Sequence, residues 1–357
     1  MTIKSISLSL AIACIILIAY LLLWPVGFEP PKVITEPAPQ LQGVLEPKSK
    51  LRNLTTIPTG LGPEDIAFDE NGMIYTGLDN GQIVRWQKGT QKIENWVNTQ
   101  GRPLGMEFNS KGDLIVADAI KGLLSVDKVG NIKVLATSID NKPFNFVDDL
   151  VVGADDIVYF LDSSDQYRIV NDYVFNSFID GRPHGRLLSY NPSTKQTELI
   201  RGKLFFPNGI SLSHDSKAVL VSEMMTYRVL RIETTQTKKG ELSIFSDNLP
   251  GFPNNISGTQ RGTYQLALSA PRNLEVEALQ ANSFLRKILM RLPEDIIPKS
   301  EPVKYGLVIE LNQNGQIIKS LHDPSGDNAF MLTSAIEYQG SLYLGSIGDS
   351  SVKVFGL

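Results

Sequence analysis

The sequence predicts an all-β fold, a six-bladed β-propeller, and three observations favour it. A strand–turn–strand pattern recurs through the 357 residues, and several copies are followed by a second hairpin. Units of four strands that return every ~40 to 55 residues are typical of propeller blades. The 29 glycines and 20 prolines are spread along the chain, as many short strands joined by tight turns require. A pair of β-sandwiches would also be rich in strands, but sandwiches do not repeat in this way.

Six copies of the pattern are found. In the clearest copy, Ile66 to Thr76, two strand-like stretches flank the turn at Asn71-Gly72. The other copies lie at 105–118, 150–160, 210–222, 262–267 and 336–346. The chain ends after two strands of the last unit. We therefore expect Leu51 to Ile57 to supply its outer strand, which would close the ring and hide the sheet edges.

Residues 1–28 are predicted to form a cytoplasmic tip and a transmembrane anchor. The stretch from Ile6 to Trp24 carries no charge and is about as long as a membrane-spanning helix. A cleaved signal peptide is the alternative, but the run exceeds a usual signal core and no small-x-small cleavage site follows it. Lys4 precedes the span and Glu29 follows it, which favours a single-pass protein with a cytoplasmic N-terminus. The propeller would then lie on the periplasmic, lumenal or extracellular side.

Residues 29–50 are predicted to be a proline-rich spacer, because prolines keep a chain extended and hinder its packing. The propeller then occupies residues 51–357. Within it, residues 274–292 lack turns and have helical spacing, so we expect an amphipathic helix inserted in blade five. This insertion either packs as a lid on the propeller or makes a second membrane contact, and the sequence leaves both open.

Composition excludes some partners. The formal net charge is −4 and there is no block rich in lysine and arginine, so no nucleic-acid partner is expected. The single cysteine, Cys14, lies in the apolar N-terminal segment. The soluble part therefore has neither a disulfide nor a thiolate metal site.

Polar residues directly precede the inner strand in four of the predicted blades. The inner strands of a propeller line its central channel, so residues at their starts should converge on the axis. Asparagine and aspartate before a strand often do no more than form a turn. Repetition at four equivalent positions instead favours a cation site, and donors that are all oxygens suit calcium. The predicted ligands are Glu64, Asp148, Asn208, Asn254 and Asn255.

Several stretches resemble one family, that of strictosidine synthase, the adipocyte plasma membrane-associated protein, the paraoxonases and the gluconolactonases. The resemblance covers about residues 51–357, and the N-terminal anchor also matches the adipocyte protein. The distinctive stretches are Arg102–Gly105, Ala117–Leu123, Asp162–Ser164, Phe206–Ile210, Leu249–Ile256 and Ser320–Gly326.

The resemblance implies a central calcium ion held by the predicted ligands. Family members carry asparagine in blade three and aspartate in blade five, where this chain has Asp148 and Asn254. The exchange keeps two carboxylates among the ligands, so a divalent cation can still be neutralised. In related hydrolases the blade-five aspartate is proposed as nucleophile or base. Asn254 cannot serve in that role, so Asp148 is predicted to be the catalytic base.

The function that follows is a membrane-anchored, calcium-dependent hydrolase of small lactones or aryl esters. The alternative is a non-catalytic binding or scaffold propeller with a structural cation. Blade two has Leu104 where paraoxonases have a histidine near the metal, and His184, His214 and His322 are expected at the surface or in supporting positions. No glutamate precedes the final hairpin as in strictosidine synthase, so that condensation is not expected.

Overall fold

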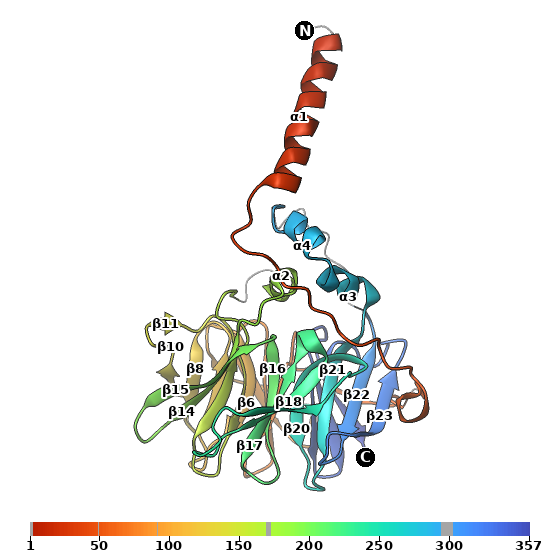
Figure 1. The fold of residues 1–357 in the computed structure, drawn as a ribbon. Helices are drawn as coiled ribbons and strands as arrows, with labels where there is room; N and C mark the ends of the chain where they lie inside the picture. The colour runs from red at the N-terminus through yellow and green to blue at the C-terminus, as the bar shows by residue number, and fades with distance from the viewer. Residues whose placement is uncertain (1–2, 49, 91, 169–172, 294–302) are drawn as a thin grey trace. The chain divides into compact units, whose positions relative to one another are not determined.

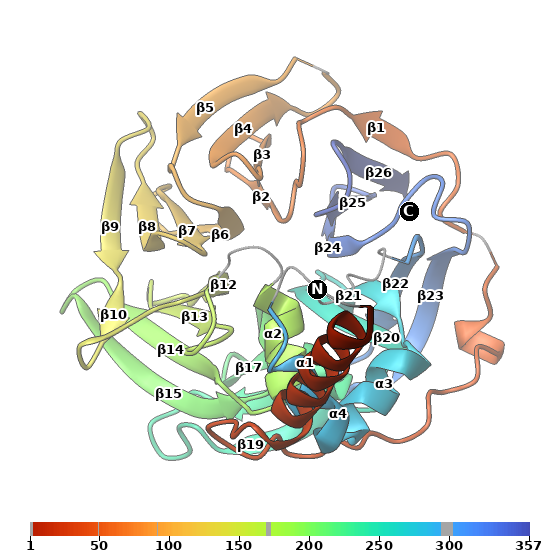
Figure 2. The same ribbon diagram turned by 90° about the horizontal axis from the view of Figure 1, so that it is seen from above.

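The structure, a computed structural model, describes residues 3–48, 50–90, 92–168, 173–293 and 303–357. Within these residues six four-stranded antiparallel sheets stand around one axis as the blades of a propeller (Figures 1 and 2). The predicted fold class is thereby confirmed. Figure 2, a view from above, shows the innermost strands of the blades ringed around the axis.

The first three blades are meanders in chain order. Blade one consists of β2 (Ile66–Phe68), β3 (Met73–Gly77), β4 (Gln82–Gln87) and β5 (Glu94–Asn98). Blade two consists of β6 (Pro103–Phe108), β7 (Leu114–Asp118), β8 (Gly122–Val126) and β9 (Ile132–Ala136). Blade three consists of β12 (Val147–Val152), β13 (Val158–Asp162), β14 (Gly185–Asn191) and β15 (Gln196–Leu204). A short ribbon of β10 (Ser138–Ile139) and β11 (Lys142–Pro143) precedes blade three.

The last three blades follow the same plan. Blade four consists of β16 (Pro207–Leu212), β17 (Ala218–Glu223), β18 (Arg228–Glu233) and β19 (Leu242–Ser246), with the 3-10 turn η2 (Met224–Thr226) after β17. Blade five consists of β20 (Gly251–Gly258), β21 (Tyr264–Pro271), β22 (Gly306–Leu311) and β23 (Ile317–Asp323). Blade six consists of β24 (Leu332–Tyr338), β25 (Ser341–Ser346), β26 (Val352–Gly356) and β1 (Thr55–Ile57).

The ring closes as the sequence predicted. Strand β1, which precedes blade one, pairs antiparallel with β26, with Thr55 opposite Val354. The pairing strand is three residues long and thus shorter than the predicted stretch from Leu51 to Ile57. Closure completes blade six with its fourth strand and covers the edge of β26, so that this edge is not open to other chains.

Apolar side chains from neighbouring blades pack together and hold the ring. One cluster joins blades two and three through Ile115, Leu123, Leu150, Phe160 and Leu188. Each such side chain contributes about 1.5–3 kcal/mol when fully buried. Because packing between blades supplies this stabilisation, the positions next to the axis are left for polar residues.

The described part of the chain also contains four α-helices, α1 (Ile3–Leu23), α2 (Tyr173–Asp180), α3 (Leu274–Ala281) and α4 (Ser283–Leu289). The insertion in blade five was predicted as one helix and is two. Asn282 separates them, because its side-chain oxygen accepts a hydrogen bond from the Leu285 N–H and caps α4. Helix α2, in the connection between β13 and β14, was not predicted.

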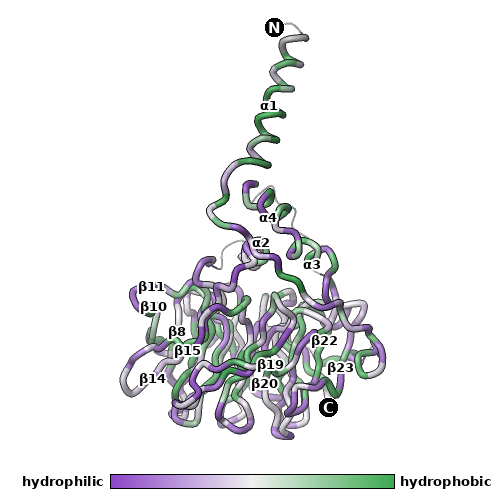
Figure 3. The backbone as a smooth tube through the Cα atoms, in the orientation of Figure 1, coloured by the Kyte–Doolittle hydropathy of each residue, from purple (hydrophilic) through white to green (hydrophobic). Residues whose placement is uncertain are grey.

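The helices and the blades fall into two compact units. The helical unit comprises Met1–Ile34, Val174–Arg182 and Asn273–Glu301, and the propeller unit comprises Thr35–Tyr173, Pro183–Arg272 and Pro302–Leu357. In the helical unit, α1 is apolar along its length, with a mean hydropathy of 2.8 over Ile6–Leu23 and none of that stretch buried (Figure 3). Such a helix is long and apolar enough to cross a membrane, and residues 1–2 of the predicted tip lie outside the described residues.

The predicted spacer differs from the expectation in its second half, which packs on the propeller. Arg272 Nη2 donates to Thr35 Oγ1 at 2.9 Å, and Asn248 Nδ2 donates to the Pro37 carbonyl at 3.1 Å. Leu45, in the 3-10 turn η1 (Gly43–Leu45), is buried in an apolar cluster of blades four and five. Proline keeps this stretch extended, but its carbonyl groups still accept hydrogen bonds from the blade loops.

Candidate metal centre

The inner strands of blades two to five carry the same irregularity next to the axis. Their pairing with the second strand skips one residue. The extra residue makes a β-bulge, which twists the strand and re-aims the side chains inside it. The paired residues within the bulges are Leu104–Gly105, Asp148–Asp149, Asn208–Gly209 and Asn254–Asn255.

In blade one, Glu64 and Asp65 stand at the corresponding place, directly before β2. We call the first residue of each pair the first row and the second residue the second row. The first row contains Glu64, Leu104, Asp148, Asn208 and Asn254, and the second row contains Asp65, Gly105, Asp149, Gly209 and Asn255.

The five predicted ligands are all buried, with exposed fractions between 2% for Asp148 and 6% for Asn208. Asn255 Nδ2 donates to Glu64 Oε1 at 3.2 Å and to Oε2 at 3.4 Å, which joins blades five and one. Ser222 Oγ links blades four and five, since it accepts from the Gly209 N–H at 2.8 Å and donates to the Asn254 carbonyl at 2.7 Å. The structure therefore places all five at the axial ends of their blades, and their role as metal ligands stays a prediction.

Two amide oxygens of this set lack a hydrogen-bond donor among the described residues, namely Asn208 Oδ1 and Asn255 Oδ1. Both are buried, and leaving a buried acceptor unpaired costs about 1–3 kcal/mol. A hard cation would satisfy such oxygens, because calcium binds carboxylate and amide oxygens and completes its shell with water. The residues present fit this ion, although no cluster of three or more His, Cys, Asp or Glu is arranged for a metal in the described ranges.

The two carboxyl groups of the first row, Glu64 and Asp148, have raised pKa values because burial disfavours their charged forms. Burial raises the pKa of Asp148 to about 8, against hydrogen bonding from Ser163 and the charge of Arg102. Burial, followed by the charges of Asp65 and Asp148, raises the pKa of Glu64 well above its usual range. A bound divalent cation would oppose these effects and keep both groups ionised.

Arg102 also belongs to the site, although the sequence analysis assigned no role to it. The residue is 6% exposed, and its Nη2 donates to the Gly62 carbonyl at 3.0 Å. Its Nη1 is buried and has no partner among the described residues. Its charge lowers the pKa of both Glu64 and Asp148, so it lies within electrostatic reach of both.

The acids of the second row are committed to the protein itself. Asp65 Oδ2 accepts the Met106 N–H at 3.0 Å, which ties blade one to blade two. Asp149 Oδ2 accepts the Ile210 N–H at 2.8 Å, which ties blade three to blade four. These side chains thus act as staples, by which we mean hydrogen bonds that hold neighbouring blades together.

The intervening members of the second row are glycines for a steric reason. A Cβ on Gly105 would lie 2.2 Å from Asp149 Oδ1, and one on Gly209 would lie 2.4 Å from the Asn255 Cα. The second row therefore alternates a large polar residue with a glycine from Asp65 to Asn255. That alternation is visible in the sequence and could have revealed this row.

A cavity of 270 Å³ lies in the central channel, next to the second row. It reaches Asp65, Asp149 and Asn255 but not Glu64, Asp148, Asn208 or Asn254. Glu107 lines it, and burial raises the pKa of this group to about 7 against a hydrogen bond from the Val152 N–H. The channel is therefore acidic below the first row.

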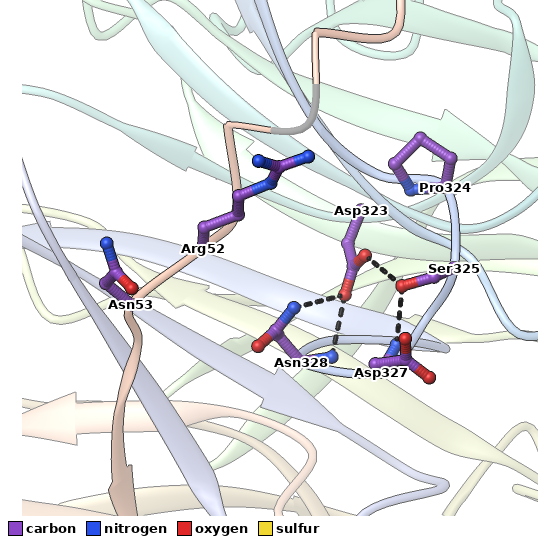
Figure 4. A pocket seen from close by; sticks show the side chains of 7 residues that line it. All are labelled: Arg52, Asn53, Asp323, Pro324, Ser325, Asp327 and Asn328. Carbon is purple, nitrogen blue, oxygen red and sulfur yellow. Dashed lines mark hydrogen bonds between the residues drawn. The ribbon is translucent and has the colours of Figure 1, made fainter.

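A larger cavity of 480 Å³ involves part of the Ser320–Gly326 stretch (Figure 4). There Asp323 Oδ2 accepts the N–H groups of Asn328 at 2.7 Å and Ala329 at 3.0 Å, and Oδ1 accepts the Ser325 hydroxyl at 2.9 Å. Burial raises the pKa of Asp323, but these hydrogen bonds outweigh it and lower the pKa overall. Asp323 thus stabilises the loop that follows β23.

The histidines lie outside the site. His322 is buried in β23, where its Nδ1 lies 2.9 Å from the Tyr305 hydroxyl and burial lowers its pKa to about 4. His184 contacts Asp165, and the ring of His214 packs against that of Tyr264 at a tilt of 38°.

Fold and site together define a class, the six-bladed propellers with a polar axial site. A model of the strictosidine synthase family matches residues 148–237, and a model of the N-terminal region of strictosidine synthase-like proteins matches residues 43–86. The adipocyte plasma membrane-associated protein of Rattus norvegicus is 33% identical over 97% of this chain and 96% of its own. The strictosidine synthase-like 4 protein of Arabidopsis thaliana is 31% identical over 81% of this chain and 78% of its own.

The chain therefore belongs to the strictosidine synthase-like family, which includes the adipocyte plasma membrane-associated proteins. Among solved structures, a gluconolactonase of Xanthomonas campestris matches with a TM-score of 0.62 at 13% identity, covering 94% of this chain and 99% of that one. A calcium-binding regucalcin of Agrobacterium tumefaciens matches with a TM-score of 0.57 at 12% identity, covering 85% and 91%. At these identities the likeness is one of fold.

Proposed function

We propose that this protein is a membrane-anchored, calcium-dependent hydrolase of lactones or aryl esters. One observation carries the proposal: two buried carboxyl groups and two unpaired buried amide oxygens come from corresponding positions of four blades, next to the inner strands. Such a set is costly without a cation and favourable with one. The ligands would be Glu64, Asp148, Asn208, Asn254 and Asn255.

The fold relatives support the ligand and substrate class. One is named a gluconolactonase and another a calcium-binding regucalcin, and both have the propeller found here. When bound, the cation would polarise the substrate carbonyl and stabilise the oxyanion that develops on it.

Asp148 would act as the general base, because Asn254 is an amide and Glu64 is already bound by the Asn255 amide. The Asp148 carboxylate would take a proton from water, whose oxygen forms a bond to the carbonyl carbon. The bond from that carbon to the ester oxygen then breaks, and the departing oxygen takes up a proton. A lactone would give one hydroxy acid, and an aryl ester would give an acid and a phenol.

Ser163 would position this base. Its hydroxyl lies 2.8 Å from Asp148 Oδ2 and 2.5 Å from the Pro207 carbonyl. A hydroxyl has a single proton, so it donates to Pro207 when Asp148 is protonated and is available to Asp148 when the carboxylate forms. The hydrogen-bond pair therefore accommodates both states of the proposed base.

Helix α1 supports anchoring in a membrane, and the relatives are named plasma membrane-associated proteins. We propose a single span with the N-terminus in the cytoplasm and the propeller on the periplasmic, lumenal or extracellular side. The unequal flanking charges of Lys4 and Glu29 support this direction.

One observation favours a second function, a binding or scaffold propeller with a structural cation. Leu104 fills the first row of blade two with an apolar side chain that is 4% exposed. The channel cavity, in addition, does not reach Glu64 or Asp148. A site of this kind could hold an ion without admitting a substrate.

Hydrolysis of phenyl acetate and a series of lactones by the full-length protein in detergent separates the two functions. The assays would be run with calcium and with a chelator, together with thermal unfolding under both conditions. Turnover that the chelator abolishes supports the hydrolase. Stabilisation by calcium without turnover of any substrate would favour the binding protein, and no response to calcium would overturn the metal site.

A further inference from the structure

The helical unit is assembled from three segments that are far apart in the sequence. Its central residue is Arg286 of α4, which is fully buried. Its Nη1 donates to the Asp180 carbonyl at the end of α2 at 3.2 Å, and its Nη2 donates to the Pro31 carbonyl. A Cβ on Gly181 would lie 1.9 Å from Arg286 Nη1, so only glycine fits beside the guanidinium. The insertions of blades three and five and the segment after α1 are thereby tied together.

Two further contacts tie the same elements. The Val33 N–H donates to the Gln280 carbonyl at the end of α3 at 3.2 Å. Lys287 of α4 forms an ion pair with Glu29. The segment after α1 is thus fixed along both insertion helices, and α1 and α4 have a defined position relative to one another within this unit.

Arg291, just after α4, holds the C-terminal end of α1. Its Nε donates to the Trp24 carbonyl at 2.7 Å and its Nη1 to the Leu21 carbonyl at 2.8 Å. In return, the Tyr20 hydroxyl donates to the Arg291 carbonyl at 3.0 Å. The last carbonyl groups of a helix have no partner within it, and a cation beside them is favourable. The residue that follows the end of α4 by two positions is therefore hydrogen-bonded to the last turn of α1.

This contact sets the depth of α4 if α1 spans a bilayer, and the inference rests on the proposed anchoring to that extent. Helix α1 has 21 residues, so it is about 31 Å long, close to the ~30 Å of a hydrocarbon core. Its C-terminal end, with the aromatic pair Tyr20 and Trp24, then falls at the membrane–water boundary. Because Arg291 is bonded to that end, α4 reaches the same boundary.

Helix α4 presents apolar side chains that nothing in the described residues covers. Phe284 is 56% exposed and Leu285 is 41% exposed. On α1 no residue of the stretch Ile6–Leu23 is buried. The two apolar surfaces belong to one compact unit and meet at Arg291, so a lipid surface that surrounds α1 is continuous with α4.

We propose that α4 is a second membrane contact, in which Phe284 and Leu285 insert into the headgroup region of the bilayer beside the end of α1. The partner is a phospholipid surface. The insertion in blade five then holds the helical unit against the membrane at two points.

The single cysteine makes the test direct. In a Cys14→Ser background of the full-length protein, Phe284→Cys would carry an environment-sensitive fluorophore, and the protein would be placed in phosphatidylcholine vesicles. Matched labels would be placed at Leu17→Cys, within α1, and at Val129→Cys, a propeller residue that is 81% exposed. Nitroxide lipids, which quench only fluorophores in contact with the bilayer, would then be added.

We expect blue-shifted and quenched emission at positions 17 and 284, and unquenched emission at 129. Quenching at 17 with a position 284 that behaves like 129 would overturn the membrane contact while leaving the anchor in place. Absence of quenching at 17 would overturn the anchor and the contact with it.

Two more variants of the labelled Phe284→Cys protein exclude insertion driven by the dye. Leu285→Asp should reduce quenching at 284 and leave position 17 unchanged, because it places a charge on the inserting face. Arg291→Gln should also reduce it, since the two side-chain hydrogen bonds from Arg291 to the end of α1 are lost. Full quenching at 284 in the Leu285→Asp protein would show that the dye and not the helix seeks the membrane, and would overturn the proposal.

Discussion

The two rows of residues at the propeller axis are adjacent in the sequence and similar in composition, yet they do different work. In the second row, Asp65 and Asp149 accept backbone N–H groups of the next blade. In the first row, Asp148 is hydrogen-bonded by Ser163, and Asn208 keeps an unpaired oxygen. In each of these acid pairs the second side chain therefore accepts a backbone N–H of another blade, whereas Glu64 and Asp148 accept only side-chain hydrogen bonds among the described residues.

The comparison shows that two neighbouring residues at a β-bulge can have different contacts and therefore different roles. A regular strand points two successive side chains to opposite faces, whereas a bulge sets two residues opposite one residue of the partner strand and re-aims their side chains. Residue type alone does not distinguish the rows, since Asp148 and Asp149 are identical. The predictions below test whether the first row serves function and the second row stability.

The largest effect is expected from Asp148→Asn. Replacing a general base typically lowers the rate by 10²–10⁴-fold, and the amide keeps the shape and a hydrogen-bond acceptor for Ser163. Steady-state hydrolysis of the best lactone or aryl ester would measure the loss, and thermal unfolding would check the fold. Asp149→Asn is the matched control, with turnover near that of the parent. Turnover retained in the Asp148→Asn protein would show that Asp148 is not the general base.

Calcium should stabilise the protein in a pH-dependent manner. Without the ion, the buried Asp148, with a pKa of about 8, and Asp65, with a pKa of about 7, hold protons that the unfolded chain releases near pH 4. The folded state then binds more protons than the unfolded state between about pH 4 and 8, so stability falls as pH rises through this window.

Thermal unfolding in a chelator should accordingly give a melting temperature that decreases from pH 5 to pH 8. With calcium at 100 times its Kd, the gain is about 2.7 kcal/mol, and it should be larger at pH 8 because the ligands are already ionised. Identical profiles with and without calcium would show that no ion binds to the first row.

Much of the fold was predictable from the sequence, because each blade repeats a turn and a strand pair at readable spacing. The polar members of the first row were also found, because they were expected next to the starts of the inner strands: Glu64 precedes β2, and Asp148 lies in the bulge near the start of β12. Of the second row only Asn255 was found, because the partner of Asp65 is the backbone N–H of Met106 in another blade, which no local pattern reveals. Helix α2 was missed because eight residues give too few turns for a helical period. Asn282 divided the other insertion by capping a new helix.

A smaller effect is expected at the glycines of the second row. Gly105→Ala places a Cβ 2.2 Å from Asp149 Oδ1, so a staple between blades must shift. The expected cost is about 1–3 kcal/mol, the usual range for overpacking, measured by chemical denaturation in the presence of calcium. Gly202→Ala is the control, because nothing lies within 4 Å of its added Cβ. Equal stability of the two variants would contradict the stapling role of this row.

The smallest and most specific effect concerns Arg102, whose positive charge acts on both carboxyl groups of the first row. It lowers the pKa of Glu64 and Asp148, so Arg102→Met should raise the pH at which calcium binding is half-maximal, by less than ~1 unit. Above that pH both carboxylates are ionised in either protein, and the variant should bind calcium more tightly because a repelling charge is gone. Calorimetric titration across pH, with Arg102→Lys as the charge-conserving control, would measure both.

If Arg102→Met changed the calcium affinity in the same direction at all pH values, Arg102 would act through the backbone that it holds at Gly62, and not through its charge. The expected reversal of sign instead identifies Arg102 as a fixed cation that shares the first row with the bound one. Its unpaired Nη1 then lies where a group of partial negative charge, such as a substrate carbonyl oxygen, would be favoured.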